Sequence, residues 1–317
     1  MALDHFADRL LAAVERARTP LCVGIDPRLE QLPAGMLDRH VSARPGEALA
    51  AAAEALYEFS DRVLQAVSGE VGVVKVQNAC FEVAGAPGVD AFCRTIRRAK
   101  ALGLIAISDA KRGDIGATSA AYAAAHLGGL RVGDREVEPI GADALTVNPY
   151  FGTDGVAPFI EEAVRRGRGV FVLVKTSNPS SAELQDLRSG SRKVYERLAD
   201  RVWEWARPHL GQSGYSAVGA VAGATFPQEL AALRAEMPGA ILLVPGFGAQ
   251  GGKAEDAAGA FDEGGRGAII NSSREIIFAF RKPEHRGLAP ERFEEAVAGA
   301  ARRAKAQIAA ALAARTH

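Results

Sequence analysis

The chain has 317 residues, of which 48% are hydrophobic, and its 38 basic and 38 acidic side chains leave no formal net charge. This balance provides no overall positive field that would attract nucleic acid or an anionic membrane, so neither is expected as a partner. Three cysteines without paired spacing indicate reduced thiols, and no apolar run reaches the length of a membrane span. The N-terminus is a poor targeting peptide, so we expect a cytoplasmic protein.

Short apolar runs alternate along the chain with alanine-rich segments of helical periodicity. Eight strands are predicted, at 21–25, 71–77, 104–108, 142–147, 170–175, 217–223, 240–246 and 267–271. Helices are predicted at 46–68, 88–101, 116–127, 153–167, 191–208, 226–236 and 253–263. One more helix is expected before the first strand, and a last one over 290–314.

Apolar strands separated by helices are typical of a parallel sheet covered by helices, and eight such units predict an α/β fold, a closed (β/α)₈ TIM barrel. The alternative is a doubly wound open sheet, but "GIDPRLEQL" stands where that fold has its glycine fingerprint. No linker divides the chain, so residues 1–317 are expected to form a single barrel domain with extra N- and C-terminal helices. Residues 126–143 are interpreted as a surface insertion, and 182–193 as either a mobile lid or a plain loop.

In such a barrel the C-terminal strand ends carry the chemistry. The polar residues at or near these ends are Asp26, Lys75, Asp109, Lys111, Ser177, Gln250 and Arg274. Lys75 lies within an apolar strand and needs a partner, for which Asp26 on the neighbouring strand is the candidate. The alternative is a lysine that reaches water at the strand end.

The stretch "SDAKRGDIG" (108–116) places two carboxylates around one lysine. Asp109 and Lys111 are two residues apart and face the same side of an extended chain, while Asp114 precedes a predicted helix. A helix cap with an ordinary ion pair is the simpler alternative. Because flanking carboxylates favour the charged ammonium, Lys111 is predicted to donate a proton, which disfavours a Schiff-base aldolase. A substrate carboxylate held against these anions would leave as CO₂, and Lys111 would protonate the carbanion without a cofactor.

Glycine-rich "PGFGAQGG" (245–252), followed by "INSSRE" (270–275), predicts a phosphate site after the last two strands. Gln250 can donate an amide hydrogen bond, and Arg274 can hold two phosphate oxygens. Tight turns and a surface ion pair are the alternative. Ser177 in "TSNPSS" either reads a polar base edge or belongs to an ordinary turn. No cluster has metal-ligand spacing, so no metal is expected.

These motifs together resemble the orotidine 5′-phosphate decarboxylase family. The resemblance extends from about residue 20 to 280 and is most specific in "VGIDPR", "VKVQNACFE", "DAKRGDIG", "VPGFGAQGG" and "NSSREII", in the manner of the larger bacterial branch. It implies a (β/α)₈ barrel that converts orotidine monophosphate to uridine monophosphate and CO₂ in pyrimidine biosynthesis. It also implies that no cofactor is used and that the protein is a homodimer with shared active sites.

The resemblance further implies roles for the strand-end residues. Asp26 and Lys75 would hold the ribose hydroxyls, Asp109 would face the departing carboxylate, and Lys111 would protonate C6. Ser177 would contact the pyrimidine.

Further residues would act across the dimer or on the phosphate. Asp114, with Ile115 and Thr118, would reach into the site of the partner subunit. Gln250 and Arg274 would bind the phosphate and close a loop over it. Where relatives often have glycine before the arginine, this chain has Ser273.

Two alternative functions remain open. A magnesium-dependent decarboxylase of a keto-sugar phosphate shares the "DAK" motif and the barrel, but it is expected to have an acid where Lys75 stands, and a cation there opposes a metal. The other alternative is a catalytically silent phosphate-binding barrel. It is disfavoured because polar groups are retained at the strand ends.

Overall fold

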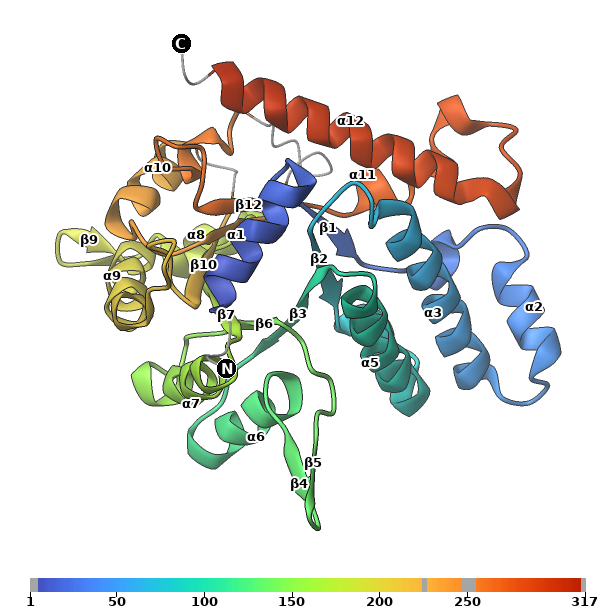
Figure 1. Cartoon of the computed structure of the whole chain (residues 1–317), viewed down its shortest axis with the longest axis horizontal. Coiled ribbons are helices and arrows are strands. Elements are labelled where there is room, and N and C mark those ends of the chain that lie inside the picture. The colour runs from blue at the N-terminus through green and yellow to red at the C-terminus, as the bar shows by residue number, and fades with distance from the viewer. Residues whose placement is uncertain (1–4, 224–226, 247–254, 315–317) are drawn as a thin grey trace.

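The computed structural model describes residues 5–223, 227–246 and 255–314 (Figure 1). Eight parallel strands close into a barrel in the order β1-β12-β11-β10-β7-β6-β3-β2. Their bounds are β1 (Leu21–Ile25), β2 (Val73–Gln77), β3 (Ile105–Arg112), β6 (Ala144–Val147), β7 (Gly169–Lys175), β10 (Val218–Ala222), β11 (Leu242–Val244) and β12 (Ala268–Ser272). Each overlaps a predicted strand. The TIM barrel is therefore confirmed, and the open-sheet alternative is wrong.

Helices surround the strands (Figure 1). Those at predicted positions are α1 (Phe6–Ala17), α3 (Ala48–Val67), α5 (Gly85–Ala101), α6 (Gly116–His126), α7 (Thr153–Arg165), α9 (Val194–Ala206), α10 (Pro227–Glu236) and α12 (Phe293–Ala314). The predicted helix 253–263 is wrong over its described part, where only the 3₁₀ turn η4 (Ala258–Ala260) forms. Its buried residues, Ala257, Ala260 and Phe261, lie within about one turn. Burial of so short an apolar stretch does not offset the free-energy cost of helix nucleation.

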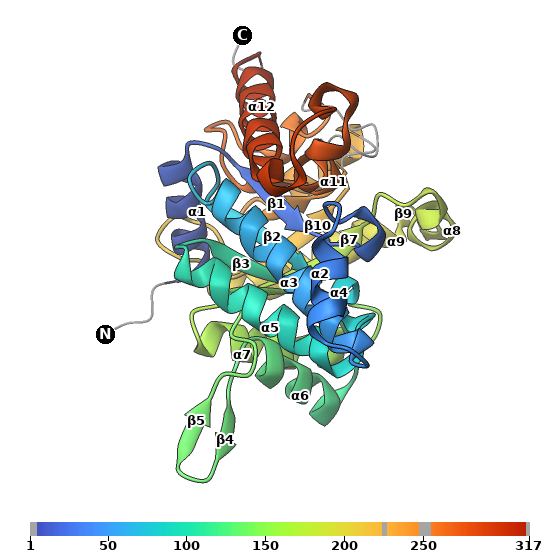
Figure 2. The same ribbon diagram turned by 90° about the vertical axis from the view of Figure 1, so that its right-hand side faces the viewer.

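The sequence analysis did not predict several short elements. They are the helices α2 (Met36–Ala43), α4 (Ala79–Glu82), α8 (Ala182–Gln185) and α11 (Arg274–Ile277), and the hairpins β4 (Leu130–Val132) with β5 (Arg135–Val137) and β8 (Arg188–Ser189) with β9 (Arg192–Lys193). Further 3₁₀ turns are η1 (Leu29–Gln31), η2 (Pro179–Ser181), η3 (Arg207–His209), η5 (Ala279–Arg281), η6 (Pro283–His285) and η7 (Pro290–Arg292). The β4–β5 hairpin lies within the expected insertion 126–143 and projects from the barrel (Figure 2).

Alternating strand side chains build two apolar layers, one inside the barrel and one beneath the helices. The N-terminal end of the barrel is closed by α1, whose Phe6 packs edge-on against Phe171 of β7 with ring centroids 6.0 Å apart. At the outside, α12 packs against α3 through stacked Phe59 and Phe293, with centroids 5.3 Å apart. Because α1 closes one end, ligands have access at the opposite, C-terminal end.

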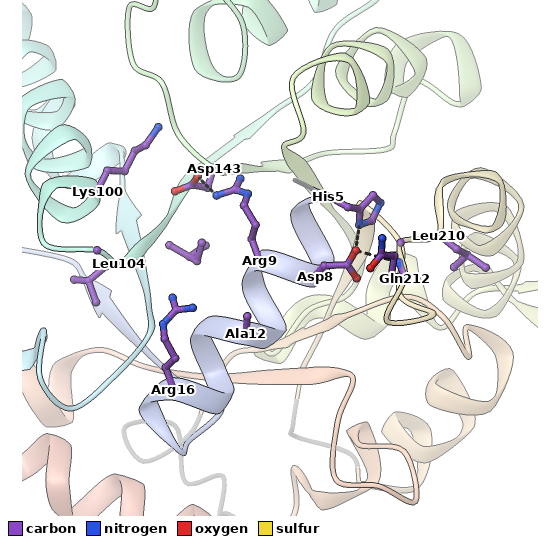
Figure 3. Close-up of a pocket in the computed structure, with 13 residues that line it drawn as sticks. His5, Asp8, Arg9, Ala12, Arg16, Lys100, Leu104, Asp143, Leu210 and Gln212 are labelled. Carbon is purple, nitrogen blue, oxygen red and sulfur yellow. Dashed lines mark hydrogen bonds and ion pairs between the residues drawn. The ribbon is translucent and has the colours of Figure 1, made fainter. Parts of the chain in front are cut away.

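A cavity of about 1000 Å³ lies beside α1 at the closed end (Figure 3). Arg9 donates to Asp143 Oδ1 and to the Gly167 carbonyl, each at 3.0 Å. Lys100 Nζ donates to the Gly141 carbonyl at 2.6 Å. Most charged groups here therefore hold α1 and the strand beginnings together. No helix in the described ranges is both long and apolar enough to cross a bilayer.

Candidate active site

The C-terminal strand ends enclose a cavity of about 570 Å³. The predicted site residues that line it are Asp26, Lys75, Asp109, Lys111, Ser177 and Arg274. Polar residues that line it without having been predicted are Arg28, Gln77, Thr146, Thr176, Asn178, Asn271 and Ser273. Gln250 lies outside the described residues. The strand-end argument thus brings together residues from the two halves of the barrel.

Asp109 is the centre of this cavity and is 4% exposed. Its Oδ2 accepts hydrogen bonds from Lys75 Nζ at 2.5 Å and from Gln77 Nε2 at 3.1 Å. Its Oδ1 accepts from Lys111 Nζ at 2.6 Å and from the Thr146 hydroxyl at 2.9 Å. Four donors from three strands therefore fix the orientation of one carboxylate.

The opposite charges of Asp109 and the two lysines stabilise one another's ionised forms. Burial raises the pKa of Asp109, but the ammonium groups of Lys75 and Lys111 outweigh burial and hold that pKa well below its usual range. Burial lowers the pKa of Lys75, but Asp109 and Asp26 outweigh it and raise that pKa. Asp109 is thus an anion and Lys75 a cation at neutral pH.

The principal partner of Lys75 differs from the expected one. Asp26 Oδ1 lies 3.9 Å from Lys75 Nζ, whereas Asp109 is in direct hydrogen-bond contact. The register brings both aspartates near Lys75, since Lys75 pairs with Gly24 of β1 and Ile107 of β3, and each aspartate lies two residues beyond. Asp26 Oδ1 is buried and has no hydrogen-bond partner among the described residues, so its contact with the Lys75 ammonium is electrostatic.

Lys111 has an unusual backbone conformation for a residue with a side chain. Its φ is 47°, in the left-handed region, and its N–H donates to the Thr146 hydroxyl at 3.0 Å. The pairing of β3 with β6 is irregular between Ser108 and Arg112. This local turn lets the half-exposed Lys111 side chain reach back to Asp109 while still lining the cavity.

Arg274 also lines the cavity, as the first residue of α11 after β12. It follows Ser273, whose hydroxyl accepts from Asn271 Nδ2 at 3.3 Å. A β-carbon built on Gly24 of β1 would lie 1.8 Å from Ser273 Oγ. The serine that stands where glycine was expected is therefore accommodated by a glycine on the neighbouring strand.

Asp114 and Thr118 are not brought to the cavity of their own chain. The Asp114 carboxylate accepts from the N–H of Ile115 at 2.8 Å, and the residue that caps α6 is Ile115 rather than Asp114. Thr118 is exposed on α6. Their expected action in a partner subunit stays a prediction.

Thr146 and Gln77 were not predicted, although both are polar residues at or near the C-terminal end of a strand, where the sequence analysis looked for site residues. Gln77 is the last residue of β2, and Thr146 is the polar residue near the end of β6. Both donate to Asp109, so they complete the carboxylate's hydrogen bonds. Asn271 has the same strand-end position on β12.

A profile described as the "Orotidine 5'-phosphate decarboxylase / HUMPS family" matches residues 19–286. The chain belongs to this family. An orotidine 5′-phosphate decarboxylase of Rhodopirellula baltica is 47% identical over 279 residues, covering 88% of this chain and 90% of the relative. One of Deinococcus radiodurans is 42% identical over 275 residues, covering 86% and 89%. The solved OMP decarboxylase of Leishmania donovani superposes with a TM-score of 0.72 at 31% identity and covers 97% of this chain and 98% of its own.

Proposed function

We propose that this chain is an orotidine 5′-phosphate decarboxylase, which converts orotidine monophosphate to uridine monophosphate and CO₂ in pyrimidine biosynthesis. The observation that carries the proposal is the buried Asp109 carboxylate held between Lys75 and Lys111 in a cavity of about 570 Å³. Such a volume suits a small organic ligand. Membership of the family and relatives of that name at 47% and 42% identity support the same substrate.

The cavity residues suggest how the substrate is held. All four residues concerned line the cavity. We assign Arg274 to the phosphate, Asp26 and Lys75 to the ribose hydroxyls, and Ser177 to the base. Such a pose directs the carboxylate of the pyrimidine toward Asp109. Gln250, which we expect to help bind the phosphate, lies outside the described residues.

The reaction then follows from the charges. The ionised Asp109 repels the substrate carboxylate, and the bond between C6 and that carboxylate breaks to release CO₂. The electron pair left on C6 is stabilised by the Lys111 ammonium, which donates its proton to C6 and becomes a neutral amine. Lys111 regains a proton from solvent before the next turnover. All charges in these reaction steps belong to the chain or the substrate, so we propose that no cofactor takes part.

We also propose a homodimer with shared active sites. Large apolar side chains near Asp114 are exposed, with Ile115 at 55%, Tyr150 at 77% and Phe151 at 46%. Gly155 lies against both the Asp114 carbonyl and the Phe151 side chain, so the segments carrying these residues are adjacent. An exposed apolar patch beside residues that do not reach their own cavity favours an interface there. The cytoplasm is the compartment we propose, in keeping with three free cysteines.

The test is a spectroscopic assay of the purified chain on orotidine monophosphate, with and without a chelator. We expect equal rates of uridine monophosphate formation in both conditions. A rate abolished by the chelator would favour the magnesium-dependent alternative instead. Binding of the nucleotide with no turnover in either condition would favour a silent phosphate-binding barrel.

A further inference from the structure

We propose that Gln185, which lies outside the cavity, positions the loop that contacts the base, and that the segment 182–193 is a fixed support rather than a moving lid. The proposal rests on the proposed function, because it concerns how the base of the nucleotide is recognised. The loop consists of Thr176, Ser177 and Asn178, and all three residues line the cavity. We refer to these three residues as the base loop.

One amide side chain holds the start of this loop. Gln185 Oε1 accepts from the Thr176 backbone N–H at 3.0 Å, and Gln185 Nε2 donates to the Thr176 hydroxyl at 2.7 Å. That hydroxyl in turn donates to Asn178 Oδ1 at 2.6 Å. Gln185 therefore fixes both the main chain and the side chain of Thr176, and through it the side chain of Asn178.

The other side of the base loop packs on the barrel. A β-carbon at Gly223, which follows β10, would lie 3.1 Å from the Ser177 nitrogen and 3.2 Å from its Cα. The Gly223 N–H donates to the Lys175 carbonyl at 2.8 Å. Ser177 is thus held between the barrel wall and the residue that Gln185 fixes. Removing Gln185 would release one of its two supports.

Ion pairs of its neighbour Asp186 hold Gln185 itself in place. Lys175, the last residue of β7, is 2% exposed and donates to Asp186 Oδ1 at 2.8 Å. Asp186 immediately follows Gln185 and also lies 3.3 Å from Lys193 Nζ. Lys193 donates to Glu229 of α10 at 3.1 Å.

These contacts tie Asp186 and Lys193 of the segment 182–193 to β7 and α10. Lys175 Nζ also lies 3.8 Å from Glu229 Oε2, but Asp186 is its hydrogen-bonded carboxylate. Moving the segment away would take that carboxylate from a buried ammonium, which is costly. The charges therefore favour a segment that stays in place during turnover. Gln185 then acts on the base loop as a fixed anchor.

The base and the phosphate of the nucleotide are assigned to two different sets of residues. Gln185 supports the residues expected at the base, which follow β7, whereas the phosphate is assigned to Arg274, which follows β12; β10 and β11 lie between these two strands. A ligand with a base should therefore depend on Gln185. A ligand that consists only of the sugar phosphate should not.

The test compares Gln185→Leu, which removes both hydrogen bonds, with Gln185→Glu, which retains an oxygen for the Thr176 N–H. Glu183→Gln, an exposed residue of the same short helix, is the matched control. Dissociation constants for uridine monophosphate and ribose 5-phosphate are measured by calorimetry, together with kcat and KM for orotidine monophosphate. For Gln185→Leu we expect roughly tenfold weaker binding of uridine monophosphate and a similar rise in KM, the size of one lost hydrogen bond. Ribose 5-phosphate binding should stay within about twofold of wild type, since it makes no contact with the base loop. Gln185→Glu should fall between wild type and Gln185→Leu, and the control should match wild type.

Unchanged uridine monophosphate binding in Gln185→Leu would overturn the proposal, and so would an equal loss for both ligands, which indicates general distortion. If Gln185→Leu does not fold, Thr176→Val carries the same comparison, because it removes the hydroxyl link and retains the N–H bond. A wild-type protein that neither binds uridine monophosphate nor turns over orotidine monophosphate would refute the proposed function itself. A normal wild type with an unaffected Gln185→Leu would refute only the positioning role.

Discussion

Asp109 accepts four hydrogen bonds, two of them from ammonium groups, so its ionisation is linked to the stability of the fold. Its folded pKa lies below the value of 3.8 for an unperturbed aspartate. The ionised carboxylate therefore stabilises the protein fully above about pH 4, and this contribution is lost as the pH falls through the lower folded pKa. Lys75 behaves oppositely, because its pKa is raised, and its contribution is lost only in strongly alkaline solution.

We predict that Asp109→Asn lowers the free energy of unfolding at pH 7 by about 3 kcal/mol, because it leaves the buried Lys75 without its closest carboxylate. The difference from wild type should shrink below about pH 4, where Asp109 takes up a proton in the unfolded wild type while the folded carboxylate is still charged. Urea denaturation at pH 7 and pH 3 measures both values. Asp114→Asn, outside the cavity, is the control and should change stability little. A difference that stays the same at both pH values would contradict the assigned ionisation.

At this scale, the sequence predicted that Asp109 and Lys111 face the same side, and their side chains are in contact. The contact is made through the left-handed turn at Lys111, which strand alternation does not predict. The sequence also did not predict which carboxylate lies closest to Lys75. The register of β1, β2 and β3 brings both aspartates to one level beside Lys75, so both lie within reach of it. Register is set by contacts between distant segments and is not visible in a single strand.

Among the elements, β1 and β12 meet through an unusually close contact. Gly24 lies against Ser273, and any side chain at position 24 would collide with the serine hydroxyl. We predict that Gly24→Ala lowers the free energy of unfolding by about 2 kcal/mol, as overpacking does in tight interiors.

The matched rescue is Gly24→Ala combined with Ser273→Gly, which removes the colliding hydroxyl. Thermal or urea denaturation of the two single variants and the double variant gives a coupling energy. The double variant should recover most of the lost stability. A double variant that loses the sum of the two single effects would show that this contact does not limit the packing.

Element by element, the strands were predictable because each is a compact apolar run between turn residues. The two hairpins were not, since β4–β5 has three residues in each strand and β8–β9 has two, too few for a periodic pattern. The segment 182–193 could not be assigned as a lid or a loop from its polarity. Its contacts with Lys175 and Glu229 come from elsewhere in the chain, and they decide for a fixed support in our proposal.

For the whole molecule, the proposed dimer with shared sites predicts that two inactive variants restore activity when their subunits are mixed. Lys111→Ala and Asp114→Ala should each be inactive alone. In a mixed dimer, one site would combine the intact Lys111 of one subunit with the intact Asp114 of the other. Random exchange should therefore restore about a quarter of the wild-type activity.

Subunit exchange must be shown independently, for example with two different affinity tags. Equal mixtures are then assayed before and after exchange. No gain of activity despite proven exchange would contradict the shared site. The dimer itself could be expected from the family resemblance, whereas the exposed side chains of Tyr150 and Phe151 beside Asp114 became visible only in the folded chain.

The most direct measurement compares wild type with Lys111→Ala, recording both decarboxylation of orotidine monophosphate and the dissociation constant of uridine monophosphate. We predict that turnover falls by at least about a thousandfold, because the proton donor is lost. Binding of uridine monophosphate should persist, since the groups assigned to the phosphate and the base lie elsewhere in the cavity. A Lys111→Ala protein that retains wild-type turnover would contradict the assignment of Lys111 as the proton donor.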